Sequence, residues 1–189
     1  MELTTDRLIL RDFVFDDWPA VLAYQRDPRY LRYYPWTERT PEDVQRFVQR
    51  FLDQQQAQPR VKVQLALVLK STGQLIGNCG IRQEAFDEPQ ADIGYELNPD
   101  QWGHGYATEA ARAIVEFGFT RLKVHRIWAR CLAANTASAR VLERLGMHPE
   151  GRPRETDYFK GRWWDTLMYA LLEDDWRARN QATRNQVSP

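Results

Sequence analysis

The segment from Leu97 to Glu109 changes from strand to helix within a few residues, and no other feature constrains the fold as strongly. The preceding run, Ala91–Leu97, has the composition of a strand, and Pro99 and the glycines at positions 103 and 105 end it. From Ala107 onward, small and apolar residues recur at the spacing of one helix face. A strand that leads through a short turn into a helix predicts a sheet covered by helices.

The rest of the chain predicts further strands and helices around this segment. A strand over 7–11 precedes a helix capped by Asp17 and a second helix that begins at Thr40 and Pro41. The segment 28–41 between them is predicted to be an aromatic loop. Downstream we expect a hairpin over 61–69 and 75–81, a strand over 125–132, a helix from Asn135 to Gly146, and strands near 152–159 and 163–172.

The order of these elements is β α α β β β α β α β β, which is neither a strict alternation nor two separate blocks. We therefore predict an α/β fold of the mixed α+β type, with a twisted sheet of about seven strands and helices on both faces. The chain has 189 residues, a length suited to one domain. We assign that domain to residues 1–177 and expect 178–189 to be a polar C-terminal tail that frays.

Composition argues against several classes of protein. Lys and Arg total 26, as do Asp and Glu, so the formal net charge is zero and no nucleic-acid partner is expected. No apolar run approaches the roughly 20 residues of a membrane helix, and the N-terminus lacks the apolar region of a signal peptide. We therefore expect a cytoplasmic protein with no membrane partner. Cys79 and Cys131 are expected to be thiols, and without a CxxC or HxxxH pair no metal site is predicted.

The turn after Leu97 has the features of an anion site. The first amides of the next helix have no partner within it and carry the positive end of its dipole, and glycine lets a ligand approach the backbone closely. These features favour a phosphate or diphosphate, and the alternative is a plain strand–turn–helix connection. A P-loop is excluded because no Lys-Ser/Thr pair follows the glycines. A dinucleotide fingerprint is excluded because Thr108 stands at the position of its third glycine.

A second helix start, Asn135–Ser138, follows another predicted strand. Two neighbouring strands that each end at a helix N-terminus can splay apart and open a slot between them. The exposed edge of 93–97 would then pair with an extended, amide-rich ligand as with an added strand. Coenzyme A has this shape, since a pantetheine arm follows its diphosphate.

The chain resembles the GNAT superfamily of acetyltransferases, and within it the ribosomal-protein N-terminal acetyltransferase (Rim-type) branch. Four blocks in the same order carry the resemblance, which extends over nearly the whole chain. They are Thr4–Arg11, Ile93–Leu97 with Trp102–Ala110, Asn135–Ser138 with Leu145–Met147, and Gly161–Asp165 with Tyr169. The resemblance implies a GNAT-like sheet with splayed central strands, and an N-acetyltransferase that uses acetyl-CoA and no metal.

The resemblance also implies roles for individual residues. The main chain of Leu97 would pair with pantetheine and direct its N–H at the thioester carbonyl. Asn135 and Ser138 would contact the pantetheine arm or the sulfur. Leu142 occupies the position of the tyrosine that often protonates the leaving thiolate, so Ser138 is the substitute that the resemblance suggests. The coenzyme's diphosphate would rest on the backbone amides of Gly103, His104, Gly105, Tyr106, Ala107 and Thr108, next to Trp102, which replaces the Gln or Arg frequent in the superfamily.

Direct attack of an amine on a thioester requires a group that accepts a proton and a donor for the developing oxyanion. Glu96 is the first candidate for the base, and Asp92, four residues earlier on the same strand face, is the second. The alternative for Glu96 is an edge charge that faces solvent or pairs with an arginine. His104 needs no catalytic role.

The acceptor is expected to be a primary amine, either a protein N-terminus or a small molecule such as a polyamine. By position, the 28–41 loop and the 152–165 hairpin should border its pocket, and Glu155, Asp157 or Asp165 are candidates to hold a cationic amine. One alternative is a non-catalytic acyl-CoA-binding or regulatory domain, and another is an enzyme for longer acyl groups. We expect a monomer or a homodimer.

Overall fold

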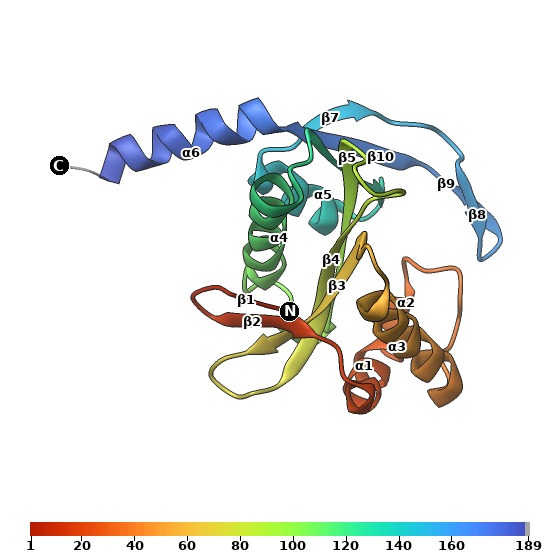
Figure 1. Ribbon diagram of the computed structural model, residues 1–189. Coiled ribbons are helices and arrows are strands. Elements are labelled where there is room, and N and C mark those ends of the chain that lie inside the picture. Colours follow the sequence, from red (N-terminus) through yellow and green to blue (C-terminus); the bar gives the residue numbers. More distant parts are fainter. Residues whose placement is uncertain (188–189) are drawn as a thin grey trace.

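The computed structural model describes residues 1–187 and contains a central sheet with helices on both faces (Figure 1). The strands are β1 (Glu2–Thr4), β2 (Leu8–Asp12), β3 (Lys62–Leu69), β4 (Leu75–Arg82), β5 (Gln90–Leu97), β6 (Arg126–Leu132), β7 (His148–Gly151), β8 (Asp157–Phe159), β9 (Arg162–Trp164) and β10 (Thr166–Leu172). The helices are α1 (Trp18–Gln25), α2 (Pro28–Leu31), α3 (Pro41–Gln56), α4 (Tyr106–Phe117), α5 (Thr136–Leu145) and α6 (Glu173–Val187), with short helical turns at Phe15–Asp17, Pro99–Gln101 and Gly118–Leu122.

Eight strands form one sheet in the order β1-β2-β3-β4-β5-β6-β10-β7, and β8 and β9 form a separate hairpin. Neighbouring strands of the sheet are antiparallel except β5 and β6, which are parallel. The predicted fold class is confirmed, with one strand more than the seven expected. The sequence pattern does not predict β1 or β7 because both are short and largely polar, and the strand predicted over 163–172 is divided at Asp165 into β9 and β10.

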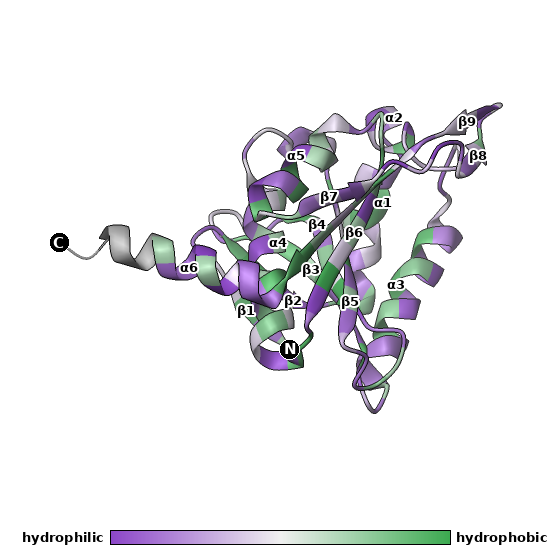
Figure 2. Ribbon diagram, turned by 90° about the horizontal axis from the view of Figure 1, so that it is seen from above, coloured by the Kyte–Doolittle hydropathy of each residue, from purple (hydrophilic) through white to green (hydrophobic). Residues whose placement is uncertain are grey.

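Each face of the sheet is covered by its own hydrophobic core. On one face, α4 and α5 bury Ile114 and Leu142 against strand residues such as Ile127. On the other face, α1, α2 and α3 bury a second set that includes Val44 and Val48. Figure 2 shows alternating hydrophobic and hydrophilic bands along α3, as expected for a helix with one side on the sheet. The prediction of helices on both faces is confirmed.

The two predicted helix starts in the first third of the chain have different outcomes. At Thr40 the prediction is confirmed, since its Oγ1 accepts from the Asp43 N–H at 3.2 Å and the Asp43 carboxylate accepts from the Thr40 N–H at 3.1 Å. At Asp17 the helix start is confirmed, since α1 begins at Trp18, but the predicted capping is wrong because the Asp17 side chain makes no hydrogen bond to the first turn of α1. The carboxylate pairs instead with Arg11 at 2.7 Å and accepts from the Val14 N–H at 2.9 Å.

The segments predicted to be irregular contain helices. The 28–41 segment begins with α2, whose cap Asp27 accepts from the Arg29 N–H at 2.8 Å, so the prediction of a loop throughout is wrong there. The segment 178–189 begins within α6, which leads away from the sheet in Figure 1 and is helical to Val187. Residues 188–189 lie outside the described part of the chain. Within residues 1–187, no helix combines the length and the apolar character needed to cross a membrane.

Candidate active site

The parallel strands β5 and β6 separate partway along their length, and this opens the site. Their paired residues end at Asp92 and Trp128. β5 nevertheless stays paired with β4 as far as Leu97, and the next amide, of Asn98, donates to the Ile76 carbonyl at 2.7 Å. Because bonding alternates along an antiparallel pair, the N–H and C=O of Leu97 point away from β4 and into the gap. The predicted splay is confirmed.

The loop after β5 presents unpaired backbone amides to this gap. Gly103 and Gly105 lie at φ +80° and +81°, in the left-handed region that favours glycine. α4 begins at Tyr106, and the amides of its first turn have no partner inside the helix. The buried hydroxyl of Thr108 also lacks a hydrogen-bond partner among the described residues. Amides, hydroxyl and helix dipole together suit an anion.

Trp102 and His104 of this loop both make contacts within the protein. Trp102 Nε1 donates to the Leu97 carbonyl at 3.0 Å, which leaves the Leu97 N–H as the backbone group that faces the gap. The His104 ring stacks on Tyr106 with centroids 5.6 Å apart, and its carbonyl accepts from Arg7 Nη1 at 3.0 Å. His104 does not line the cavity that is described next.

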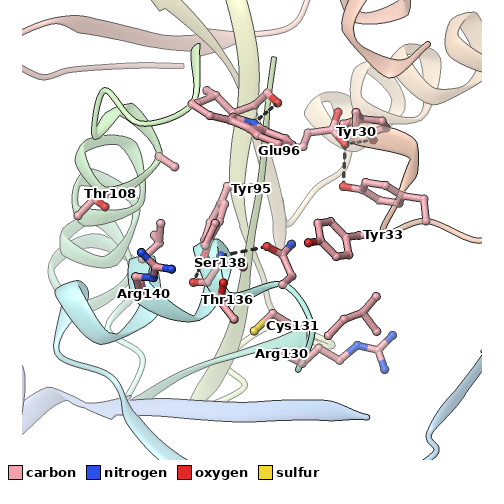
Figure 3. Close-up of a pocket in the computed structure, with 18 of the residues that line it drawn as sticks. Tyr30, Tyr33, Tyr95, Glu96, Thr108, Arg130, Cys131, Thr136, Ser138 and Arg140 are labelled. Carbon is pink, nitrogen blue, oxygen red and sulfur yellow. Dashed lines mark hydrogen bonds between the residues drawn. The ribbon is translucent and has the colours of Figure 1, made fainter. Parts of the chain in front are cut away.

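A cavity of about 810 Å³ joins the loop, the splayed strands and the start of α5 (Figure 3). Of the two predicted bases, Glu96 lines this cavity and Asp92 does not. Asp92 pairs with Arg82 and lines a separate cavity of about 310 Å³, since four residues of strand carry it about 13 Å from Glu96. The cavity brings together every predicted coenzyme residue other than His104, namely Leu97, Trp102, Gly103, Gly105, Tyr106, Ala107, Thr108, Asn135 and Ser138.

The start of α5 forms the wall opposite the open edge of β5. Asn135 Oδ1 accepts from the Ser138 N–H at 3.2 Å, so Asn135 is the helix cap, as predicted. The Ser138 hydroxyl lies 3.0 Å from the Tyr95 hydroxyl, and Tyr95 also donates to the Ser138 carbonyl at 3.0 Å (Figure 3). Burial raises the pKa of Tyr95, so its phenol stays protonated. Cys131 lies beside Ser138 as a free, half-buried thiol.

Glu96 is surrounded by neutral donors from α1, α2 and the neighbouring strand β4. Its Oε1 accepts from the Tyr24 hydroxyl at 2.6 Å, Gln25 Nε2 at 2.9 Å and Asn78 Nδ2 at 2.6 Å, and its Oε2 accepts from the Tyr30 hydroxyl at 2.6 Å. Burial, and then the charge of Glu96, raise the pKa of Tyr24 and Tyr30, which keeps both phenols as donors. Among the described residues no arginine or lysine pairs with Glu96, so the alternative of an arginine-paired edge charge is excluded.

The 28–41 segment and the β8–β9 hairpin border the other end of the cavity, as predicted. Lys160 Nζ donates to the Leu31 carbonyl at 2.7 Å and joins the two segments. Figure 3 shows Tyr30 and Tyr33 on the opposite side of the cavity from Thr108 and Arg140. The lining residues at this end are Tyr30, Tyr33, Tyr34, Pro35, Asp157, Tyr158 and Phe159.

Of the three acidic candidates on the final hairpin, only Asp157 lines the cavity. Asp165 pairs with Arg152 at 3.0 Å and accepts from the Glu155 N–H at 3.1 Å, outside the cavity. Asp157 Oδ2 accepts from the hydroxyls of Thr156 at 3.0 Å and Thr166 at 3.1 Å. No cation pairs with Asp157 in the described part of the chain, so its charge is available to a ligand.

The cavity-lining residues that sequence reasoning misses include Tyr95, Arg140 and Arg144. Tyr95 precedes Leu97 by two positions, so strand alternation predicts that both side chains share one face. Arg140 and Arg144 are four residues apart on α5 and share a helix face. Within residues 1–187, no group of three or more His, Cys, Asp or Glu side chains is arranged to hold a metal ion.

Comparison with known proteins identifies the family. Residues 7–148 match the acetyltransferase (GNAT) domain. The N-acetyltransferase YnaD of Bacillus subtilis (strain 168), described as uncharacterized, is 37% identical over 177 residues, which cover 93% of this chain and 99% of that protein. The crystal structure of a GNAT-family acetyltransferase from Bacillus anthracis is 34% identical, with a TM-score of 0.80 over 92% of this chain and 99% of that one.

Two other proteins extend the comparison. The ribosomal protein uS5 alanine N-acetyltransferase of Escherichia coli (strain K12) is 31% identical over 84 residues, 44% of this chain and 43% of that protein. The structure of spermidine N-acetyltransferase from Vibrio cholerae, in complex with CoA and spermine, matches with a TM-score of 0.77 at 16% identity. The match covers 92% of this chain and 99% of that one, and it shows a similar fold.

The chain belongs to the GNAT family of acetyltransferases and is an acyltransferase. The predicted resemblance is confirmed, and a ribosomal-protein N-acetyltransferase is among the relatives.

Proposed function

We propose that the protein transfers an acetyl group from acetyl-CoA to a primary amine, which attacks directly while both substrates are bound. One observation carries the proposal: a single cavity joins the unpaired amides at the start of α4, the open edge of β5 and the carboxylate of Glu96. An amine and a thioester could therefore meet beside a base without leaving the cavity.

The residues around the gap fit the chemistry of the coenzyme. Amides of the first turn of α4 suit a diphosphate, together with the Thr108 hydroxyl, which has no partner within residues 1–187. The exposed edge at Leu97 suits the amides of a pantetheine arm, which Asn135 and Ser138 border from α5. When bound, acetyl-CoA supplies the activated acetyl group as a thioester.

Three groups of this chain are assigned to the transfer. The Leu97 N–H donates to the oxyanion that develops on the thioester carbonyl. Glu96 accepts the proton of the attacking amine, directly or through water. The Ser138 hydroxyl, which lies 3.0 Å from the Tyr95 hydroxyl, donates a proton to the leaving sulfur and regains one from solvent, to which Glu96 releases the proton of the amine. Asp92 is not retained as a base, because it lines a different cavity.

The acceptor end suits a cationic amine. Asp157 offers a carboxylate that has no cationic partner among the described residues, and Tyr33 and Tyr158 offer aromatic surface at the same end of the cavity. The Vibrio cholerae enzyme is named for spermidine and the Escherichia coli relative for a ribosomal-protein alanine, and both acceptors present an amine. We assign Asp157 to the ammonium group that either kind of acceptor carries.

The proposed reaction is tested by mixing the protein with acetyl-CoA and a panel of polyamines, amino-acid derivatives and peptides with free N-termini. We expect free CoA thiol to be released only when an accepted amine is present, and mass spectrometry should find one added acetyl group on it. Kinetics with longer acyl-CoA esters should give lower kcat/KM than acetyl-CoA.

A non-catalytic acyl-CoA-binding or regulatory domain is the second candidate. Leu142, which is 1% exposed in the core, favours it slightly, because the resemblance expects a tyrosine acid at that position. This candidate predicts that calorimetry detects CoA binding and that no amine in the panel is acetylated.

Arg140 and Arg144 are expected to pair with the coenzyme's phosphate groups, because both line the cavity and neither pairs with an acid among the described residues. Replacement of both by Gln should weaken CoA binding about tenfold, as expected for the loss of charge-assisted contacts. Calorimetry at low and moderate salt should find the difference largest at low salt. An unchanged dissociation constant would remove both arginines from the coenzyme site.

A further inference from the structure

The turn between β1 and β2 is distant in sequence from the cavity, yet it is bonded to the first turn of α4. Glu109, in that first turn, accepts at Oε1 from the Thr5 hydroxyl at 2.6 Å and the Arg7 N–H at 2.9 Å. Its Oε2 accepts from Arg7 Nε at 2.7 Å and lies 2.6 Å from Nη2. Four contacts therefore fix one carboxylate of α4 to the N-terminal turn.

Arg7 also holds the glycine loop that precedes α4. Its Nη1 donates to the His104 carbonyl at 3.0 Å, and its guanidinium lies 4.5 Å from the centre of the Tyr106 ring. A Cβ built on Gly105 would come within 3.6 Å of Nη2, so the guanidinium lies directly against the loop. The His104 carbonyl is thereby directed at Arg7, away from any ligand on the first amides of α4.

The charge of Arg7 has a second consequence. A carboxylate in the first turn of α4 lies close to the amides that suit a diphosphate, and an unneutralised Glu109 would repel that anion. Burial alone would raise the pKa of Glu109, but hydrogen bonds from Thr5 and Arg7 hold it below its usual value, so the carboxylate is charged at neutral pH. Arg7 supplies the compensating charge at 2.6 Å.

We propose that the Thr5–Arg7 turn is part of the coenzyme site, with Arg7 as a positioning residue. It fixes the loop from His104 to Tyr106 in the conformation that receives a diphosphate, and it neutralises Glu109 beneath the bound anion. The inference rests on the proposed function, because it assumes that a diphosphate ligand occupies the start of α4. Neither Thr5 nor Arg7 lines the cavity, so both act through the residues that they hold.

The test compares Arg7→Gln with the double variant Arg7→Gln, Glu109→Gln. Arg7→Gln should raise the CoA dissociation constant and the KM for acetyl-CoA about tenfold, the size expected for a charge near a helix N-terminus together with a disturbed loop. The kcat at saturating acetyl-CoA and the KM for the amine should change less than twofold. General loss of structure would instead change kcat and both KM values together. The double variant should recover part of the affinity, because no uncompensated carboxylate remains.

The matched control is Arg46→Gln, since Arg46 makes a similar 2.6 Å ion pair with Asp43 on the distant helix α3. It should leave CoA binding unchanged. If Arg7→Gln unfolds, the CoA dissociation constant of Arg7→Lys is compared with that of the wild type instead, and it should rise by less than tenfold because the charge beside Glu109 is kept. An Arg7→Gln variant that is folded and binds CoA within twofold of the wild type overturns the inference. Failure of the proposed function is distinguishable, because the unmodified protein would then either not bind CoA or bind it without acetylating any amine.

Discussion

Replacement of Glu96 by glutamine is expected to lower kcat about 100-fold, the usual contribution of a positioned base, while the CoA dissociation constant changes less than twofold. Glutamine keeps the size of the side chain but cannot take a proton. Its carbonyl oxygen can still accept from Tyr24, Gln25 and Asn78, and its amide can donate to the Tyr30 oxygen. Steady-state kinetics with saturating substrates, together with calorimetry of CoA binding, measure both quantities.

Glu143→Gln is the matched control for this variant. Glu143 also accepts from a tyrosine, the Tyr169 hydroxyl at 3.1 Å, but it does not line the cavity, so its replacement should leave kcat unchanged. A folded Glu96→Gln variant with full kcat would contradict the assignment of the base. Glu96 would then serve only to join α1 and α2 to the sheet through its bonds to Tyr24 and Tyr30.

The geometry of the end proposed for the coenzyme could be predicted from sequence because its determinants are local. Gly103 and Gly105 adopt the left-handed conformations that their residue type allows, and Asn135 caps the helix that follows it. The splay of β5 from β6 could also be predicted from local sequence, because each of the two strands is followed directly by the start of a helix. His104 is the exception, since it does not line the cavity, and Arg7, which bonds its carbonyl, lies 97 positions away.

The acceptor end could not be predicted to the same depth, because its contacts join distant parts of the chain. Strand alternation places Asp92 and Glu96 on one face, but only the folded structure distinguishes a carboxylate paired with Arg82 from one surrounded by Tyr24 and Tyr30. Tyr24 and Tyr30 lie 72 and 66 positions from Glu96, and no local pattern connects them. Likewise, the sequence does not distinguish Asp157 from Glu155 and Asp165. Only the folded hairpin shows that Asp157 lines the cavity and that the other two do not.

Replacement of Asp157 by asparagine is expected to raise the KM for the amine about 30-fold, the value of a charge-assisted contact to an ammonium group. The KM for acetyl-CoA should stay within twofold, because Asp157 lies at the end of the cavity away from the start of α4. Asparagine retains an oxygen that can accept from Thr156 and Thr166, so the hairpin should keep its structure. Initial rates at varied amine concentration, with acetyl-CoA saturating, measure the effect.

Glu155→Gln provides the comparison, since Glu155 lies on the same hairpin but outside the cavity, and it should leave the amine KM unchanged.

The variants Asp157→Asn and Glu96→Gln together distinguish binding of the amine from proton transfer. If Asp157→Asn lowers kcat and spares the amine KM, while Glu96→Gln does the reverse, the two carboxylates have exchanged their proposed roles: Asp157 accepts the proton and Glu96 holds the ammonium group. If neither quantity changes in Asp157→Asn, the acceptor is not held by this hairpin, and the tyrosines of the 28–41 segment are left as its binding surface.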